Sequence, residues 1–382
     1  MRKEISSPHG KFQIIDLARS FSILAVMAGH FHGFPPPAVS FQTLWLRVQE
    51  NNTYGVCVFF VISGFLITQL IDRRVGGLFH PQFTEFYVRR AARIFPLLSL
   101  VIFLGLVFTF VFPEHSMKYL FCFKTTEMSF NSLFWISILA FCYNWFQVFF
   151  PDNNPGIYWG VLWSLSVEEQ FYVFYPPLLK KLRNESRFCF WMIGVIFLGL
   201  FWRLGVFLWG VPYGAISVKA SFGAFDQIAF GCLLYLTFRD LGGTLERHKK
   251  ASILLCLAGI GILIPTYLGT VDRGIDLIYG PFFIALGAFF FLLGGLHWPF
   301  WESKFLTPFS LPGRYSYGLY LLHMLVFYLL FPWLIHFNVF LAFGLFALIA
   351  TLFAGLSYHL FELPANFRIR EFFRLKAVEK NN

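Results

Sequence analysis

The chain has 382 residues, 57% of them hydrophobic and only 13% charged, with a formal net charge of +10. A soluble globular domain carries about 25% charged residues, so this composition excludes an ordinary soluble protein. The apolar residues recur in blocks of about 18 to 22, the length that a helix needs to cross roughly 30 Å of hydrocarbon. We therefore predict an all-α fold, a polytopic bundle of membrane-spanning helices.

Ten spans are expected, in the order 14–34, 54–72, 95–113, 158–178, 188–209, 220–238, 251–270, 276–296, 315–336 and 339–360. If the N-terminus lies inside, 23 of the 30 Lys and Arg residues fall in inner segments and only five in outer segments. The positive-inside rule requires this asymmetry, so the basic charge orients the chain and implies no nucleic acid partner. We predict one membrane domain over 1–382, with a core at 14–362, a basic cytoplasmic tail at 363–382 and no fused soluble domain.

Residues 130–150 are apolar enough to form a further span. Such a span would turn every later basic segment outward, against the positive-inside rule. We therefore expect a re-entrant or interfacial element on the outer side, where Asn144, Gln147 and neighbouring aromatic side chains suit the membrane interface.

The six cysteines are scattered and lie mostly in apolar runs. Cys in such runs behaves as a small hydrophobic residue. The sequence has no CxxC and no His/Cys pair at metal-ligand spacing, so we expect neither a metal nor a disulfide.

The first span contains Asp16, Arg19 and His30 in the sequence DLARSFSILAVMAGH. A charge inside the membrane costs at least ~2.5–3.5 kcal/mol on insertion scales, so these residues mark a candidate functional site. The 11-residue separation of Arg19 and His30 puts them on one helix face, about 16 Å apart along the axis. Asp16 is close enough to pair with Arg19. Alternatively, Arg19 could extend to inner lipid phosphates, and His30 could be a hydrogen-bonded packing residue.

The fourth span, with the sequence YWGVLWSLSVEEQFYVFYPP, carries adjacent carboxylates at Glu168 and Glu169. Ser164, Glu168 and Tyr172 share one helix face, because they are four residues apart. Two buried carboxylates need a cation, hydrogen bonds or a proton. We therefore expect one of them to pair with an Arg or His of another span.

Four further polar residues lie in later spans, namely Arg203, Asp226, Tyr320 and His323. Together with the polar residues of the first and fourth spans, they imply a polar cavity inside the bundle. The alternative is that oppositely charged residues neutralise one another and only hold helices together.

Three arginines, Arg89, Arg90 and Arg93, lie between the second and third spans in the sequence FTEFYVRRAARIFP. We expect them on an interfacial helix at the inner face. They could be topology anchors. They could also form a phosphate clamp, since Arg binds phosphate through two parallel hydrogen bonds.

These segments together resemble the acyltransferase-3 family of membrane O-acyltransferases. DLARSFSILAVMAGH is similar to its Arg-x10-His signature, FYVRRAARIFP to its basic inner-loop motif, and LWSLSVEEQFYVFYP to its Trp-Ser-Leu-x-x-Glu motif. FFVISGFLIT and SYGLYLLH resemble its second-span motif and its late Tyr-x-x-His segment. These blocks occur in family order from Asp16 to Glu362.

The resemblance implies an enzyme of the bacterial plasma (inner) membrane, a multi-pass protein with both termini in the cytoplasm. Its reaction would move an acyl group, by default acetyl, from acyl-CoA to a hydroxyl of a cell-surface glycan or lipid-linked saccharide. His30 and Arg19 match the signature residues and Glu168 matches the motif glutamate, so these three are the implied catalytic residues. The three arginines of the basic motif match the residues associated with the acetyl-CoA donor.

In this hypothesis His30 is the general base, because burial favours the neutral imidazole that can accept a proton. Glu168 or Asp16 could orient the imidazole. The alternative function is a transporter of a glycan or small molecule, in which intramembrane carboxylates and histidines relay protons. Many transporters are built from two repeated halves, and the sequence shows no sign of such a repeat, which argues against that alternative.

Overall fold

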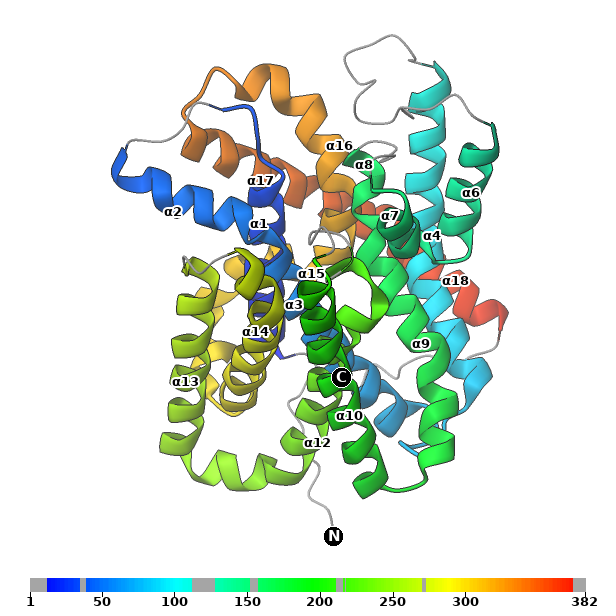
Figure 1. Ribbon diagram of the computed structural model, residues 1–382, viewed down its shortest axis with the longest axis vertical. Helices are drawn as coiled ribbons and strands as arrows, with labels where there is room; N and C mark the ends of the chain where they lie inside the picture. The colour runs from blue at the N-terminus through cyan, green and yellow to red at the C-terminus, as the bar shows by residue number, and fades with distance from the viewer. Residues whose placement is uncertain are drawn as a thin grey trace.

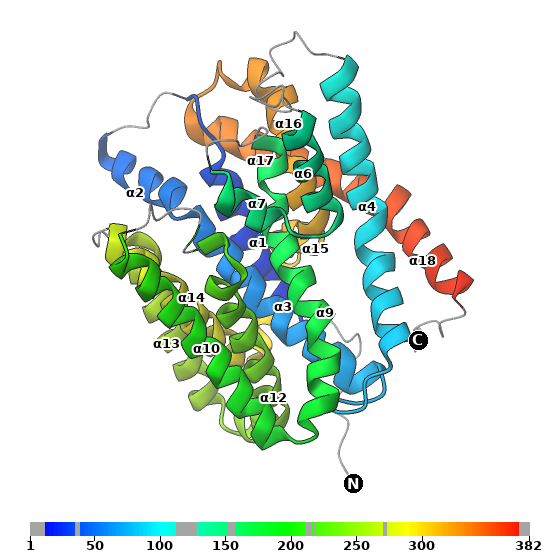
Figure 2. The same ribbon diagram turned by 45° about the vertical axis from the view of Figure 1, so that its right-hand side comes forward.

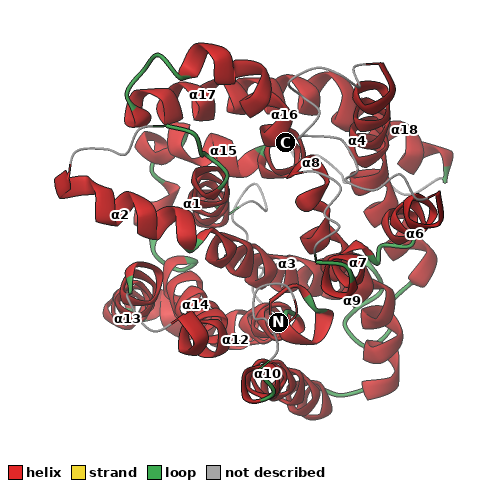
Figure 3. Ribbon diagram, turned by 45° about the horizontal axis from the view of Figure 1, so that its top comes forward, coloured by secondary structure: helices red, strands yellow, loops and turns green. Residues whose placement is uncertain are grey.

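The structure, a computed structural model, describes residues 12–34, 39–111, 128–151, 157–210, 216, 218–269 and 273–373. All regular secondary structure in these residues is helical, which confirms the predicted all-α membrane bundle (Figures 1 and 3). The longer helices are α1 (Gln13–Gly29), α3 (Asn52–Arg74), α4 (Phe83–Val111), α9 (Leu162–Leu182), α10 (Glu185–Leu208), α12 (Phe225–Arg247), α13 (Lys249–Leu268), α14 (Arg273–Gly295), α16 (Ser316–Leu334) and α17 (Val339–Ser357).

The shorter helices lie mainly between these spans or at their ends. They are α2 (Val39–Glu50), α6 (Met128–Leu139), α7 (Tyr143–Phe149), α8 (Ile157–Gly160), α15 (Leu311–Arg314) and α18 (Leu363–Phe372). A π-helical turn, Tyr358–Glu362, joins α17 to α18. Short 3-10 turns occur at Ser221–Gly223, Pro299–Glu302, Lys304–Leu306 and Pro308–Ser310.

Within the described residues, seven helical stretches are long and apolar enough to cross a membrane. They lie in α3, α4, α10, α13, α14, α16 and the continuous α17–α18 segment, and each overlaps a predicted span. The stretch in α4 begins 12 residues before the predicted start at 95, and the last stretch continues 12 residues beyond the predicted end at 360. The other three predicted spans correspond to α1, α9 and α12. α1 has only 17 residues, whereas α9 contains Glu168 and α12 contains Asp226. These three shorter or more polar helices carry four acidic residues that the sequence analysis discusses, namely Asp16, Glu168, Glu169 and Asp226.

The basic turns of the chain gather at one end of the bundle. The α9–α10 turn, the α12–α13 turn and the C-terminal end of α3 all lie at the bottom of Figures 1 and 2, whereas the α16–α17 turn lies at the opposite end. The first two turns and the residues beside them include Lys180, Lys181, Arg183, Arg247, Lys249 and Lys250. This arrangement agrees with the predicted alternation of inner and outer segments.

Residues 130–150 do not form one membrane-crossing helix. They fold into α6, with 12 residues, and α7, with seven, separated by a turn in which Phe141 has a φ of 53°. At 1.5 Å per residue these helices are only about 18 Å and 10 Å long. The segment therefore has the form expected of a re-entrant or interfacial element.

α15 is held tightly against the first turns of α1. A Cβ atom at Gly313 would lie 1.7 Å from the Asp16 carbonyl oxygen, so the two backbones are in direct contact. The Gly313 N–H donates a hydrogen bond of 2.7 Å to Ser20 Oγ, which itself donates to the Asp16 carbonyl oxygen at 3.0 Å. These contacts fix the position of Asp16 and of Arg19, one turn later.

α3 and α12 also approach each other backbone to backbone. A Cβ atom at Gly64 would lie 2.0 Å from the Ile228 carbonyl oxygen, and one at Gly231 would lie 1.9 Å from the Val61 carbonyl oxygen. Small residues at such crossings let membrane helices pack closely without a hydrophobic driving force. The crossing holds α3, which carries Ser63, against the rest of the bundle.

Gly231→Ala is expected to destabilise the protein, whereas Gly243→Ala in the same helix is not. The added methyl group at position 231 would push α12 away from Val61, and overpacking of this kind costs about 1–3 kcal/mol. Nothing lies within 4 Å of a Cβ atom at Gly243, and Ala is the better helix former. Thermal unfolding of both variants in one detergent measures the difference. Equal unfolding midpoints for the two variants would show that α3 and α12 can move apart at this crossing without loss of stability.

Candidate active site

His30, which directly follows α1, contacts His323 of α16. The Nδ1 atom of His30 lies 3.1 Å from Nε2 of His323, and the ring centroids are 5.2 Å apart. His323 is fully buried, and its Nδ1 atom lies 2.8 Å from the Tyr320 carbonyl oxygen and 3.1 Å from that of Leu319. His30 is only partly buried, and no described residue bonds to its Nε2 atom. One ring nitrogen of His30 is therefore available to a substrate.

Tyr320, almost one turn before His323, joins α16 to α9. Ser164 Oγ donates to the Tyr320 hydroxyl at 2.7 Å, and that hydroxyl donates to the Val161 carbonyl oxygen at 2.9 Å. The structure thus brings the predicted residues Ser164, Tyr320 and His323 into one cluster.

Glu168 and Glu169 of α9 share Arg90 of α4. The Arg90 Nη2 atom lies 3.0 Å from Glu169 Oε1 and 3.9 Å from Glu168 Oε2. The guanidinium carbon lies 3.9 Å from the centroid of the Tyr172 ring, a cation–π contact. Ser63 Oγ of α3 donates to Glu168 Oε1 at 2.6 Å. Arg90 is therefore the cation from another span that the paired carboxylates were expected to require.

Neither of the carboxylates considered for His30 is its partner. Glu168 bonds to Ser63 and lies near Arg90, while Asp16, at the opposite end of α1, lies 4.0 Å from Arg19. Helix packing brings α16 rather than a carboxylate against the end of α1. In the structure the imidazole of His30 is paired with a second histidine and not with either carboxylate.

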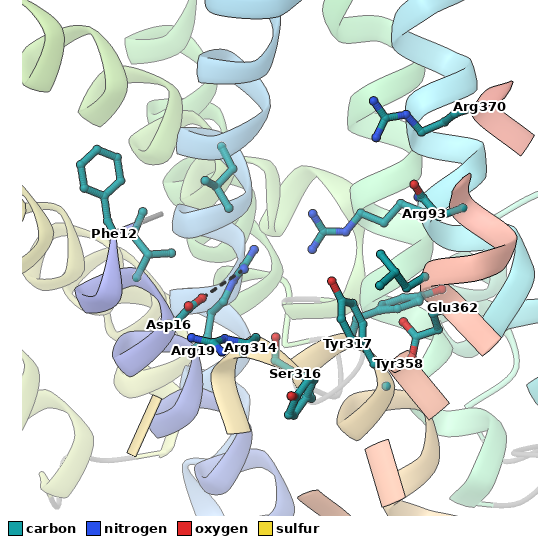
Figure 4. Close-up of a pocket in the computed structure, with 16 residues that line it drawn as sticks. Phe12, Asp16, Arg19, Arg93, Arg314, Ser316, Tyr317, Tyr358, Glu362 and Arg370 are labelled. Carbon is teal, nitrogen blue, oxygen red and sulfur yellow. Dashed lines mark ion pairs between the residues drawn. The ribbon is translucent and has the colours of Figure 1, made fainter. Parts of the chain in front are cut away.

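A pocket of about 380 Å³ opens beside the first turns of α1 (Figure 4). Its charged lining residues are Asp16, Arg19, Arg93, Arg314, Glu362 and Arg370. Four arginines against two carboxylates leave the lining with a positive charge. Figure 4 shows Arg93 extending from α4 into the pocket, and the Nη2 atom of Arg370 is buried without a hydrogen-bond partner. Such a lining suits an anion that offers several acceptor oxygens, such as a phosphate.

The three arginines of the basic motif have three different environments. They are helical, as predicted, but they lie in the same continuous helix, α4, as the third predicted span. Arg89 Nε donates to Glu85 Oε1 at 2.8 Å within that helix. Arg90 binds the carboxylates of α9, and of the three only Arg93 lines the pocket. Neighbouring helices, and not the spacing of the motif, decide which arginine faces a ligand.

The pocket and the histidine pair lie toward the two ends of α1. Asp16 and Arg19, in the first turns of α1, line the pocket. His30, directly after the last residue of α1, contacts His323.

A hydrogen-bond network positions Lys219, between α10 and α12. Asn144 of α7 donates to the Lys219 carbonyl oxygen at 3.1 Å and to Ser221 Oγ at 2.9 Å, and Gln170 donates to Asn144 Oδ1 at 2.8 Å. Burial lowers the pKa of the Lys219 ammonium group. The prediction placed Asn144 at the membrane interface. In the structure it is instead fully buried in this network.

Arg203 and Asp226 form a closed pair that does not line the pocket. Both side chains are fully buried, and two hydrogen bonds of 2.7 and 3.1 Å join the guanidinium to the carboxylate. Arg203 also donates to the Gly223 and Ile278 carbonyl oxygens at 2.7 and 2.9 Å. The pair joins α10, α12 and α14. It therefore matches the alternative in which oppositely charged residues neutralise one another and hold helices together.

Sequence reasoning missed four residues of the site, namely Ser63, Arg314, Glu362 and Arg370. Ser63 is one of two hydroxyl residues in the mostly apolar FFVISGFLIT block, and this was the available signal. Arg370 lies in the predicted basic tail. α18 packs along α4 (Figure 2), and Arg370 lines the pocket. The π-helical turn before α18 contributes Glu362, and π-helical turns occur frequently at functional sites.

No group of three or more His, Cys, Asp or Glu side chains in the described part of the chain could hold a metal ion. The five cysteines that the structure describes are free. Cys122 lies outside the described residues.

Comparison with known proteins gives a consistent result over most of the chain. A sequence model described as an acyltransferase domain matches residues 12–359. The peptidoglycan O-acetyltransferase OatA of Listeria monocytogenes is 26% identical over 324 residues, which cover 81% of this chain and 48% of the relative. The O-acetyltransferase OatA of Staphylococcus aureus is 26% identical over 332 residues, 81% of this chain and 49% of the relative. The chain thus spans about half the length of these curated relatives, and no solved structure matches it.

Proposed function

Because the chain belongs to the acyltransferase family whose sequence model matches residues 12–359, we propose that it transfers an acetyl group from acetyl-CoA to a glycan hydroxyl. One observation carries the proposal. A cationic pocket and a histidine with an available Nε2 atom lie at opposite ends of the same helix. The name of the Listeria relative makes peptidoglycan the first acceptor to test, with other cell-surface or lipid-linked saccharides next.

The pocket supports acetyl-CoA as the donor. Coenzyme A carries several phosphate charges at one end and its thioester at the other. Arg93, Arg314 and Arg370 offer forked donors that match phosphate oxygens. The rise of about 16 Å from Arg19 to His30 is comparable to the length of the pantetheine arm. A donor with its nucleotide in the pocket could therefore present its thioester near His30.

In the proposed reaction the Nε2 atom of His30 takes the proton of the acceptor hydroxyl while the hydroxyl oxygen attacks the thioester carbonyl carbon. The carbon–sulfur bond then breaks, and the proton on His30 passes to the departing thiolate. The products are an acetyl ester and free CoA. No covalent acyl-enzyme is required for this balance.

The proposed location is the bacterial inner membrane, with both ends of the chain in the cytoplasm. The basic turns would then face the cytoplasm. The start of α1, with the pocket, would face the supply of acetyl-CoA, and His30 would lie toward the outer side. An acetyl group could thus cross the membrane while the glycan stays outside.

Proteoliposomes containing the purified protein test the proposal. Acetyl-CoA with a radioactive acetyl group is supplied on the side of the basic turns, and soluble peptidoglycan fragments on the other. We expect base-labile label on the glycan together with release of free CoA. Intact acetyl-CoA after incubation with each acceptor class would overturn the proposal.

Arg93→Gln is expected to raise the KM for acetyl-CoA roughly 10- to 100-fold and to change kcat much less. A hydrogen bond to a charged group contributes about 1.5–3 kcal/mol, and each 1.4 kcal/mol is tenfold in affinity. Arg89→Gln is the matched control, because Arg89 binds Glu85 and does not line the pocket. Steady-state kinetics measure both variants. An equal rise in KM would assign donor binding to the whole basic motif.

A further inference from the structure

We propose that His323 is a positioning residue that fixes the tautomer of His30, so that the Nε2 lone pair of His30 faces the acceptor hydroxyl. The inference rests on the proposed function, in which His30 is the base. It assigns a separate role to a histidine that touches neither substrate and acts only through His30.

The first step concerns the proton of His323. Its Nδ1 atom lies 2.8 Å from the Tyr320 carbonyl oxygen and 3.1 Å from the Leu319 carbonyl oxygen. Carbonyl oxygens only accept hydrogen bonds, so Nδ1 must carry the hydrogen. A neutral imidazole has one N–H group, and its other nitrogen is then an acceptor. The backbone of α16 therefore makes Nε2 of His323 an acceptor.

The second step passes this assignment to His30. Its Nδ1 atom lies 3.1 Å from Nε2 of His323. Two facing lone pairs cannot form a hydrogen bond, so Nδ1 of His30 must donate. The Nε2 atom of His30 is then unprotonated, and it is the nitrogen to which no described residue bonds. The nitrogen available to the acceptor hydroxyl is thus the one that can act as a base.

The third step concerns the protonated state. Once His30 has taken a proton at Nε2, its Nδ1–H group donates from a cation, and such charge-assisted bonds are roughly twice as strong as neutral ones. His323 can provide this support while remaining neutral, because the backbone already engages its own N–H group. A carboxylate in the same buried place would instead add a charge before the reaction, at a large cost in desolvation. A histidine pair keeps the resting site uncharged.

Two substitutions at position 323 separate positioning from packing. His323→Leu fills similar space but accepts no hydrogen bond, so we expect kcat to fall about 10²- to 10⁴-fold while the KM for acetyl-CoA stays unchanged. His323→Gln offers an amide oxygen to the Nδ1–H group of His30, and we expect it to keep kcat within about tenfold. The control is His336→Gln, an exposed histidine beyond the end of α16, with wild-type kcat.

Nuclear magnetic resonance of the ¹⁵N-histidine-labelled protein in nanodiscs reads the tautomer directly. The signals of His30 are assigned by their loss in His30→Gln. We expect Nδ1–H in the wild type and in His323→Gln, and an altered tautomer population in His323→Leu. A wild-type His30 protonated at Nε2 would overturn the inference, and so would His323→Leu with wild-type kcat.

These outcomes are distinguishable from failure of the proposed function. A protein that consumes no acetyl-CoA would reject the reaction, whereas the tautomer of His30 in the resting protein could still be measured. If His323→Leu does not fold, the wild-type spectrum alone tests the inference, because it shows whether His30 carries its hydrogen at Nδ1.

Discussion

His30→Gln is expected to lower the rate of acetyl transfer about 10²- to 10⁴-fold, the range that a general base contributes. Glutamine retains polar groups and much of the size of the side chain, but it cannot take a proton from a hydroxyl. His30 is only partly buried, and among the described residues the one bonding partner of its side chain is His323, at Nδ1. The variant should therefore fold, and its KM for acetyl-CoA should stay near the wild-type value. Initial rates of CoA release with the purified protein measure the effect.

His32→Gln provides the comparison for that result. His32 lies two residues further along the chain but is exposed, so its replacement should leave the rate near that of the wild type. A loss of activity in both variants would indicate a general disturbance after α1. Wild-type activity in His30→Gln would remove His30 as the base and, with it, the role assigned to the histidine pair.

Arg203→Met is expected to destabilise the protein by about 3–5 kcal/mol, the cost of breaking a buried ion pair from one side. The substitution would leave the fully buried carboxylate of Asp226 without its cation. It would also free the Gly223 and Ile278 carbonyl oxygens that Arg203 binds. Because the pair joins three helices, thermal unfolding in detergent should show a large decrease in the midpoint.

The double variant Arg203→Met with Asp226→Asn tests whether the pair is structural. Removing both charges relieves the cost of the unpaired carboxylate, so the double variant should regain part of the stability that the single variant loses. Its acetyl transfer at a permissive temperature should stay close to the wild-type rate. A stable double variant with no activity would instead support the substrate role first considered for Arg203 and Asp226.

The sequence predicted those features that depend on a single helix or on the distribution of charge along the chain. The spacing of Arg19 and His30 predicts one helix between them, and the structure places Arg19 in the second turn of α1 and His30 directly after its end. The distribution of Lys and Arg predicted the turns that gather at one end of the bundle. It also predicted a re-entrant or interfacial element at 130–150, and this segment folds into two short helices. Each of these features depends on helix geometry or on a charge count.

Contacts between distant elements could not be predicted in this way. His30 and His323 are 293 positions apart, and nothing in either helix identifies the other as its partner. Arg89, Arg90 and Arg93 have similar chemistry in sequence, yet their roles depend on where α9 and α18 pack against α4. The sequence offered Glu168 and Asp16 as possible partners of His30 for the same reason, since charge complementarity does not determine which helices are neighbours.

The contact between α15 and the first turns of α1 has a consequence for how the chain can change in length. Because Gly313 lies against the Asp16 backbone and bonds to Ser20, α1 cannot slide or rotate freely at its start. One residue inserted between Arg19 and His30 would therefore turn His30 by about 100° and advance it by 1.5 Å, away from His323. Substitutions on the outward side of α1, such as at Phe21, which is 63% exposed, carry no such penalty. The number of residues in α1 between Arg19 and His30 is therefore fixed. Substitutions on its exposed side are tolerated, whereas insertions and deletions are not.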